Sequence, residues 1–205
     1  MIEVEIKLPL RQRDNAVKET DRIAAALCGM GFRKAARFRQ RDSYFDNAAG
    51  EIRAGGKALR IRKTEDLIQG GVTAELNFKG PRLDQVSMTR QELETEVGQA
   101  ETGRQILAAL GYFPVPLEVV KERTEYRREN ITACLDRVQG LGDFLELEII
   151  VPESPDATDG GREAAGRGCG GREAALRRLE TILGELGYQM RDTVTRSYLS
   201  MLQKG

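Results

Sequence analysis

The chain has 205 residues, a length that fits one domain, and 40% of them are hydrophobic, which is enough to build a core. Its 32 Lys and Arg residues balance 32 Asp and Glu residues, so the net charge favours neither nucleic acid nor an anionic membrane as a partner. Histidine is absent from the sequence, which excludes Ser-His-Asp triads, histidine bases and imidazole metal ligands. The side chains left for catalysis are carboxylates, lysines, arginines and tyrosines, which suit phosphate and hard-metal chemistry.

The sequence carries no sign of export or of a disulfide framework. Its first ten residues, MIEVEIKLPL, include acidic residues where a signal peptide is basic and then apolar, and the apolar stretches are shorter than the ~18 residues that span a bilayer. Cys28, Cys134 and Cys169 lie far apart and form no CxxC pair, which argues against a zinc site or a disulfide framework. We therefore expect a cytosolic protein.

The predicted elements, taken along the chain, are a strand, a helix, four strands, a second helix, three strands and a last helix. The strands alternate apolar with polar residues, and we expect them at 2–8, 37–46, 57–64, 72–80, 87–97, 117–127, 130–138 and 143–151. The helices carry apolar residues at helical spacing, and we expect them at 15–30, after Asp14 as a candidate N-cap, and at 99–110 and 173–186.

The last helix follows a Pro- and Gly-rich stretch, 152–172, which lacks periodicity and is typical of a flexible loop. Eight strands at this spacing favour an antiparallel sheet closed into a barrel, with about three helices packed outside it. The expected fold is therefore α+β and mainly antiparallel β, in a single domain that covers residues 1–205.

The strands place charged residues on one face. In the first strand Glu3, Glu5 and Lys7 alternate with aliphatic residues, so they point to the same side of the sheet. The alternation recurs in later strands, at charged positions that include Arg60, Arg62, Lys79, Lys121, Arg123, Glu146 and Glu148. A sheet with one solvated face gives such a pattern as well. Here the charged faces hold almost no Ser or Thr, and three helices are available to cover the aliphatic face, so the charged face could instead line a lumen.

A charged lumen would need a partner. Two like charges ~5 Å apart repel by about 3 kcal/mol at an effective dielectric of ~20. Internal salt bridges relieve part of this repulsion at a desolvation cost, whereas a bound polyphosphate with divalent cations satisfies both kinds of charge. The pairs Glu3/Glu5 and Glu146/Glu148 each place two carboxylates on one face, and Asp136 could add a further oxygen donor for a metal ion.

A series of motifs runs through the chain. It begins with Glu3-x-Glu5-x-Lys7 and continues with Gln40-Arg41-Asp42-Ser43-Tyr44-Phe45-Asp46, Ala58-Leu59-Arg60-Ile61-Arg62, Phe78-Lys79-Gly80-Pro81, Arg90-x-Glu92-x-Glu94, Lys121-x-Arg123, Leu135-Asp136-x-Val138, Leu141-Gly142-x-Phe144-Leu145-Glu146-Leu147-Glu148 and Ser197-Tyr198-Leu199. Together these motifs resemble the CYTH superfamily, the triphosphate tunnel metalloenzymes, and the resemblance covers nearly the whole chain.

The resemblance implies an eight-stranded tunnel, open at both ends, that binds a triphosphate together with Mg²⁺ or Mn²⁺. The residues that it assigns to the metal are Glu3, Glu5, Asp136, Glu146 and Glu148. Those that it assigns to the triphosphate are Lys7, Arg60, Arg62, Lys79, Lys121 and Arg123, of which Lys7, Lys79 and Arg123 are the candidate catalytic residues. Each of these residues has an alternative role as a salt-bridge partner within the barrel.

Two segments, Tyr44-Phe45-Asp46 and Leu141-Gly142-Asp143-Phe144-Leu145-Glu146, are similar to the class IV adenylyl cyclases, which convert ATP into cyclic AMP and pyrophosphate. Ile6 stands where the triphosphatases of the family usually carry arginine. We therefore expect a cyclase with a triphosphate substrate and with neither nucleic acid nor a membrane as a partner; homodimer formation stays open. The alternatives are a triphosphatase acting on inorganic, thiamine or nucleoside triphosphate, a non-catalytic module that binds polyphosphate or nucleotide, and a barrel held by internal ion pairs alone.

Overall fold

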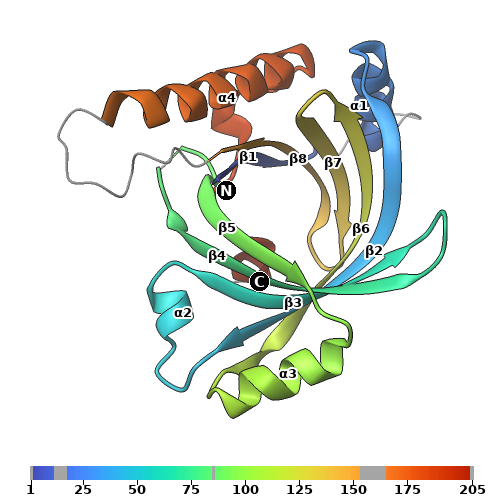
Figure 1. The fold of residues 1–205 in the computed structure, drawn as a ribbon. Coiled ribbons are helices and arrows are strands. Elements are labelled where there is room, and N and C mark those ends of the chain that lie inside the picture. The colour runs from blue at the N-terminus through green and yellow to red at the C-terminus, as the bar shows by residue number, and fades with distance from the viewer. Residues whose placement is uncertain (1, 12–17, 85, 153–164, 204–205) are drawn as a thin grey trace.

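The computed structural model describes residues 2–11, 18–84, 86–152 and 165–203, and its centre is a closed antiparallel barrel of eight strands (Figure 1). The strand order around the barrel is β1-β5-β4-β3-β2-β6-β7-β8. The bounds are β1 (Ile2–Pro9), β2 (Arg33–Asp46), β3 (Ala58–Asp66), β4 (Val72–Arg82), β5 (Arg90–Glu96), β6 (Phe113–Arg128), β7 (Ile131–Val138) and β8 (Gly142–Val151). The predicted barrel and each of its eight strands are therefore confirmed.

Some strands extend beyond their predicted ends. Strand β6 begins at Phe113, before the predicted start at 117. Its first residues include Pro114 and Pro116, which have no backbone N–H to donate to a ladder. Prolines are nevertheless tolerated where a ladder is irregular. Here the pairing of β2 with β6 shifts register between Ser43 and Phe45, opposite this part of β6. The two neighbours of β1 pair with it very unequally, since β8 pairs over its whole length but β5 pairs only at Ile2↔Gln91 and Glu3↔Arg90.

In the described residues, five helices lie outside the barrel. Their bounds are α1 (Glu19–Gly29), α2 (Glu51–Ala54), α3 (Ala100–Ala109), α4 (Ala165–Glu185) and α5 (Tyr198–Leu202), with a 3₁₀ turn, η2, at Met190–Asp192. Helices α1, α3 and α4 correspond to the three predicted ones, whereas the short α2 and α5 were not predicted. Asp14, the candidate N-cap, lies outside the described residues.

Helix α4 starts earlier than expected. It begins at Ala165, so residues 165–172 belong to a helix and not to the loop predicted for 152–172; residues 153–164 lie outside the described part. The glycines in this stretch argued against a helix, but adding turns to a helix that is already anchored costs little. The anchor is the buried C-terminal half, where Leu179 and Leu183 are fully buried in the core.

The aliphatic face of the barrel points outward and is packed against helices. The largest core cluster joins Ile6 of β1 and Leu147 of β8 to Leu179 of α4 and Leu27 of α1. The opposite, charged face therefore points into the barrel, which decides between a solvated sheet face and a lumen in favour of the lumen.

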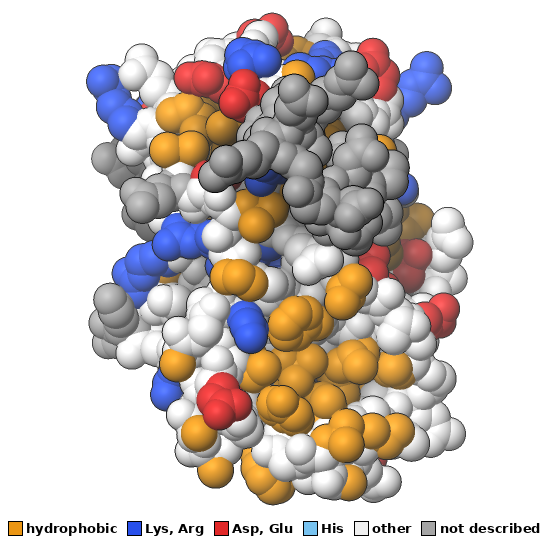
Figure 2. Space-filling view, turned by 60° about the vertical axis from the view of Figure 1, so that its left-hand side comes forward, with side chains coloured by type: hydrophobic (Ala, Val, Ile, Leu, Met, Phe, Trp, Pro, Cys, Tyr) orange, Lys and Arg blue, Asp and Glu red, His pale blue; other side chains and the backbone are white. Residues whose placement is uncertain are grey.

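The helical cover is incomplete. Leu93 of β5 is 57% exposed, and Ile106 of α3 and Leu110 directly after it are exposed as well. Figure 2 shows hydrophobic side chains gathered on the lower part of one face of the molecule. No helix within the described ranges combines the length and the apolar character that a bilayer crossing requires.

Candidate functional site

The interior of the barrel is a cavity of about 850 Å³ lined by side chains from all eight strands. It brings together almost every residue that the sequence predicted for a site. The predicted residues that line it are Glu3, Glu5, Lys7, Arg60, Arg62, Lys79, Lys121, Arg123, Glu146 and Glu148. The exception is Asp136, which is only 1% exposed and lies behind the cavity wall.

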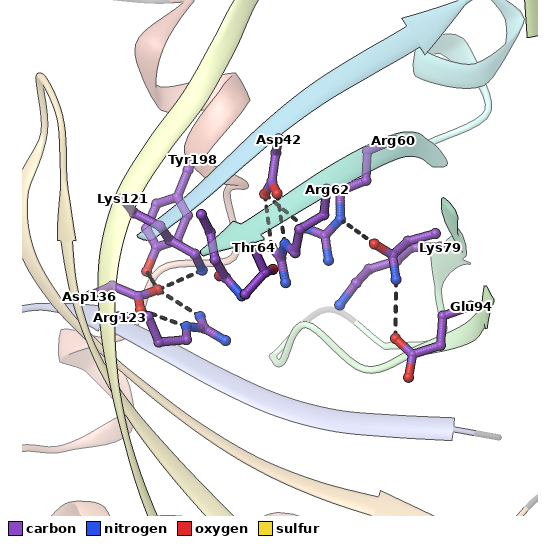
Figure 3. Close-up of polar contacts among 12 residues, drawn as sticks. Asp42, Arg60, Arg62, Thr64, Lys79, Glu94, Lys121, Arg123, Asp136 and Tyr198 are labelled. Atoms are coloured by element: carbon purple, nitrogen blue, oxygen red, sulfur yellow. Dashed lines mark hydrogen bonds and ion pairs between the residues drawn. The ribbon is translucent and has the colours of Figure 1, made fainter. Parts of the chain in front are cut away.

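Asp136 holds two of the cations from behind (Figure 3). Its carboxylate accepts hydrogen bonds from Lys121 Nζ at 2.8 Å, from Arg123 Nε and Nη2 at 2.7 and 2.6 Å, and from the hydroxyl of Tyr198 at 3.0 Å. Burial raises the pKa of Asp136, but the charges of Arg123 and Lys121 outweigh it and hold the pKa below its usual value. Asp136 thus orients two cations, and its role as a metal ligand stays a prediction.

A second buried carboxylate, Asp42 of β2, does the same for Arg60 and Arg62. Arg62 donates to both oxygens of Asp42, from Nε at 2.7 Å and from Nη2 at 2.8 Å, and Arg60 Nη1 lies 3.3 Å from Oδ2. The two guanidinium groups outweigh the effect of burial and hold the pKa of Asp42 well below its usual value. Since a bidentate pair fixes the plane of an arginine, the free edge of Arg62 has a defined orientation.

Sequence reasoning assigned no role to Asp42. The available signal was its place between Gln40 and Tyr44, because residues two apart on a strand share a face. All three side chains are largely buried on the inner side of β2, at 6%, 1% and 8% exposure.

The lysines of the tunnel are paired with carboxylates of the central section. Lys7 Nζ lies 2.9 Å from Glu146 Oε1 and 3.3 Å from Glu5 Oε1. Lys79 pairs with Glu3 and with Glu92, the latter at 3.3 Å. Burial lowers the pKa of both lysines, but the surrounding carboxylates outweigh it and raise each pKa above its usual value. Lys7 and Lys79 are therefore permanent cations at neutral pH and not proton acceptors.

The carboxylates on the β1–β8 side of the tunnel are crowded. Glu5 and Glu148 stand directly opposite each other in the β1–β8 ladder, a position in which like charges repel. Among the described residues Glu148 forms no ion pair, and the buried Glu5 Oε1 has Lys7 Nζ as an ion-pair partner at 3.3 Å but accepts no hydrogen bond. Burial raises the pKa of Glu148 to about 8, and the charges of Glu3 and Glu5 add to this effect. Burial likewise raises the pKa of Glu5.

This carboxylate set fits a hard divalent cation in its chemistry. Oxygen donors of this kind are the ligands that Mg²⁺ and Mn²⁺ prefer, and an added positive charge would relieve the repulsion that raises both pKa values. Within the described residues, however, no three Asp, Glu or Cys side chains are already arranged to hold a metal ion. The donors are present, but several of them are paired with Lys7 and Lys79.

The family model of the CYTH domain matches residues 1–198. The chain belongs to the CYTH family. A relative from Methanocaldococcus jannaschii, named provisionally as an adenylate cyclase, is 30% identical over 201 residues, which cover 98% of each protein. A solved structure, the PH1819 protein of Pyrococcus horikoshii, is also 30% identical, covers 98% of each chain and superposes with a TM-score of 0.78.

A more distant CYTH-like structure shares the fold. It is a Hippeastrum protein described as a provisional adenylyl cyclase with a dominant triphosphatase activity, and it is 19% identical to this chain. The alignment covers 100% of this chain and 95% of the other, with a TM-score of 0.64. Structural likeness thus extends over the whole CYTH domain.

Tyr198, which sequence reasoning quoted without a role, links α5 to the CYTH tunnel. The Tyr198 hydroxyl donates to Asp136, and the centroid of the ring lies 4.3 Å from Lys7 Nζ and 5.2 Å from Lys121 Nζ. Phe144 packs on it edge to face at 5.0 Å. A phenol therefore touches the anchoring carboxylate and two cations at once, and the local sequence gives no signal of this because α5 and β7 are far apart along the chain.

Replacing Tyr198 with phenylalanine is expected to destabilise the protein by about 1.5–3 kcal/mol, the usual range for a hydrogen bond to a charged group. The ring and its contacts with the lysines remain, so the loss reports the hydroxyl alone. Urea unfolding measures it. Thr181→Val serves as a control, because its hydroxyl bonds only to a backbone carbonyl of its own helix. Equal unfolding free energies for Y198F and the wild type would show that the hydroxyl contributes nothing.

Proposed function

We propose that the protein is a class IV-type adenylyl cyclase that converts ATP into cyclic AMP and pyrophosphate inside the tunnel. The observation that supports it best is the convergence of six cations on one enclosed cavity large enough for a nucleotide: Lys7, Arg60, Arg62, Lys79, Lys121 and Arg123. A tetra-anionic triphosphate is the kind of ligand that such a set can neutralise.

The arginines are oriented before any ligand arrives. Asp42 and Asp136 fix Arg60, Arg62 and Arg123 from the wall side, so little reorganisation is needed when phosphate oxygens replace water. Fixed donors aimed at the place where charge develops are the main source of transition-state stabilisation in low-dielectric sites. The arginines and lysines would hold the phosphate chain extended and stabilise the negative charge on the departing pyrophosphate.

The residues that would hold Mg²⁺ or Mn²⁺ are Glu3, Glu5, Glu146 and Glu148, with Asp136 as a further candidate behind them. When bound, the metal would neutralise phosphate charge and lower the pKa of the attacking hydroxyl. Lys7 and Lys79 would move from their carboxylates towards the phosphates, which would free the oxygens of Glu3, Glu5 and Glu146. The absence of histidine is compatible with this scheme, since no imidazole base is required.

The cyclase is favoured over other triphosphate reactions by the provisional name of the relative that is 30% identical. The second candidate is a metal-dependent triphosphatase, which the described activity of the Hippeastrum protein favours. The same cation set would serve either reaction, because in both reactions negative charge develops on the phosphate oxygens of the leaving group. A non-catalytic polyphosphate- or nucleotide-binding module is the third.

Product analysis separates these candidates. Purified protein is incubated with ATP and either Mg²⁺ or Mn²⁺, and the nucleotides are resolved by chromatography. Cyclic AMP with pyrophosphate is the expected result. ADP with phosphate would contradict the cyclase in favour of the triphosphatase, to be followed by inorganic and thiamine triphosphate as substrates.

Two variants make the assay specific to the tunnel. Glu5→Gln removes a tunnel carboxylate and is expected to abolish turnover, whereas Glu122→Gln removes an exposed outer-wall carboxylate and is expected to leave it unchanged. If no product forms but ATP with metal raises the melting temperature, the protein is a binding module, since a ligand that binds only the folded state stabilises it. An unchanged melting temperature would leave only a barrel held by internal ion pairs.

A further inference from the structure

One end of the tunnel carries cations that differ from the central ones. They stand where α2, the start of β3, the β4–β5 turn and the chain before α5 meet, and they line the same cavity. We call these five residues the basic mouth: Arg53, Lys57, Arg82, Arg90 and Arg196. In the part of the chain that the structure describes, none of them forms an ion pair, whereas each of the six central cations does.

Contacts between the segments show that the basic mouth is one cluster. Arg90 Nη1 donates to the carbonyl of Gly56 at 3.0 Å, next to Lys57, and Arg82 Nη1 lies 3.4 Å from the carbonyl of Thr195. Arg82 and Arg90 are also direct partners in the β4–β5 ladder. Burial lowers the pKa of Arg90, the charge of Glu5 raises it, and the nearby charge of Arg82 lowers it.

The cluster has unused capacity for an anion. Arg90 Nε is buried without a hydrogen-bond acceptor. The carboxylate of Asp46, which also lines this end, is already used, since it accepts from the backbone N–H groups of Asn47, Ile52 and Arg53. The remaining guanidinium and ammonium groups are exposed or partly exposed, so an incoming anion reaches them without any rearrangement of the barrel.

The lining away from the basic mouth has the opposite character. The β3–β4 ladder begins beside Lys57 at Ala58↔Lys79 and runs past Arg62↔Glu75 to Thr64↔Thr73. The charged residues of this more distant lining are mainly acidic, namely Glu75, Glu94 and Glu125, and Arg127, which also lines it, is paired with Glu125 at 2.9 Å. An anion therefore meets attraction at one end of the tunnel and repulsion at the other.

We propose that the basic mouth is the site at which the triphosphate first binds and through which it enters the tunnel. The unpaired cations concentrate a polyphosphate at this end, and the paired central cations then receive it as it displaces their carboxylates. This inference rests on the proposed function and adds the direction of entry and the residues that set the association rate. Focused charge of this kind raises association rates by about 10- to 1,000-fold, and salt screens it.

The test measures association directly. A variant with Arg53→Gln, Lys57→Gln and Arg196→Gln loses three exposed cations of the basic mouth. A control with Arg33→Gln, Lys63→Gln and Arg191→Gln loses the same three charges from exposed positions that do not line the cavity. Each protein is mixed rapidly with N-methylanthraniloyl-ATP and Mg²⁺ at low and at high salt, and the association and dissociation rate constants are fitted. Melting temperatures establish that all three proteins are folded.

At low salt the association rate constant of the mouth variant is expected to fall about tenfold, with little change in dissociation. The control is expected to keep the wild-type rate, and the difference is expected to vanish at ~1 M salt, where the Debye length is about 3 Å. Equal association rates for the mouth variant and the wild type would overturn the entry site. An equal fall in the control would overturn it as well, by assigning the effect to net charge. A wild-type protein that does not bind the analogue at all would instead overturn the proposed function.

Discussion

Replacing Glu148 with glutamine is expected to raise the melting temperature of the metal-free protein by several degrees while lowering metal-dependent turnover at least about a hundredfold. Glu148 stands opposite Glu5, forms no ion pair among the described residues, and has its pKa raised to about 8 by burial and by Glu3 and Glu5. An uncharged amide of the same shape removes that repulsion. The same amide is a poor metal ligand, and loss of a ligand costs more than the 10- to 100-fold typical of its supporting residues.

The stability effect has a defined pH dependence. In the unfolded chain Glu148 loses its proton near pH 4.5, but in the folded metal-free protein it keeps the proton up to about pH 8. Between these values the folded state binds more protons, so its stability falls as pH rises. The Gln variant lacks this fall in stability. The difference in stability between the variant and the wild type therefore reaches its full size above about pH 8.

Thermal unfolding in the presence of a chelator, from pH 4 to pH 9, measures this difference. Glu122→Gln removes a carboxylate that Arg37 and Arg39 hold on the outer wall, so this control is expected to lose a little stability once the carboxylate would be charged and to show no gain above pH 8. Parallel curves for E148Q and the wild type would contradict the crowding of carboxylates. Full turnover by E148Q would contradict its role as a metal ligand.

Replacing Arg123 with methionine is expected to cost about 3–5 kcal/mol of stability and to abolish triphosphate binding. Arg123 is 6% exposed and donates to Asp136 and to Glu146. Removing it leaves buried carboxylates with less compensation, and breaking a buried ion pair from one side has about this cost. Urea unfolding and titration with tripolyphosphate measure the two effects.

A second variant separates the structural effect from the binding effect. In Arg123→Met combined with Asp136→Asn, a neutral amide replaces the carboxylate that lost Arg123, so part of the lost stability is expected to return. The cation is still missing, so the affinity for tripolyphosphate is expected to stay low. Recovery of affinity in the double variant would show that Arg123 acts only by stabilising the barrel.

The period-two pattern of the sequence predicted the inner face of the barrel correctly. Glu3, Glu5 and Lys7 line the cavity because alternate residues of a strand share a face, and this holds whatever the strand pairs with. The same reasoning did not distinguish Arg123, whose guanidinium enters the cavity, from Asp136, which lies behind it. That difference depends on the register of β6 and β7, where the two residues stand opposite each other.

The anchors of the site were harder to predict because they depend on pairings between distant segments. Asp42 meets Arg62 across the β2–β3 ladder, and Tyr198 reaches Asp136 from a five-residue helix near the end of the chain. Local periodicity specifies which way a side chain points, but not which side chain of another element it meets. The start of α4 was misjudged for a related reason, since packing of Leu179 and Leu183 sustains a helix through glycines.

Among the described residues the β1–β5 ladder has two pairs, Ile2↔Gln91 and Glu3↔Arg90, and Met88 just before β5 adds a hydrogen bond from its backbone N–H to the carbonyl of Glu5 at 2.9 Å. This seam connects segments roughly ninety positions apart, so a large loop-closure entropy is opposed by few hydrogen bonds. We therefore expect the barrel to open first at this seam, in a local unfolding event that leaves the long ladders of β1–β8 and β2–β6 intact. The charged interior is closed only while this short joint holds, so we expect opening of the lumen to cost less free energy than unfolding of the whole chain.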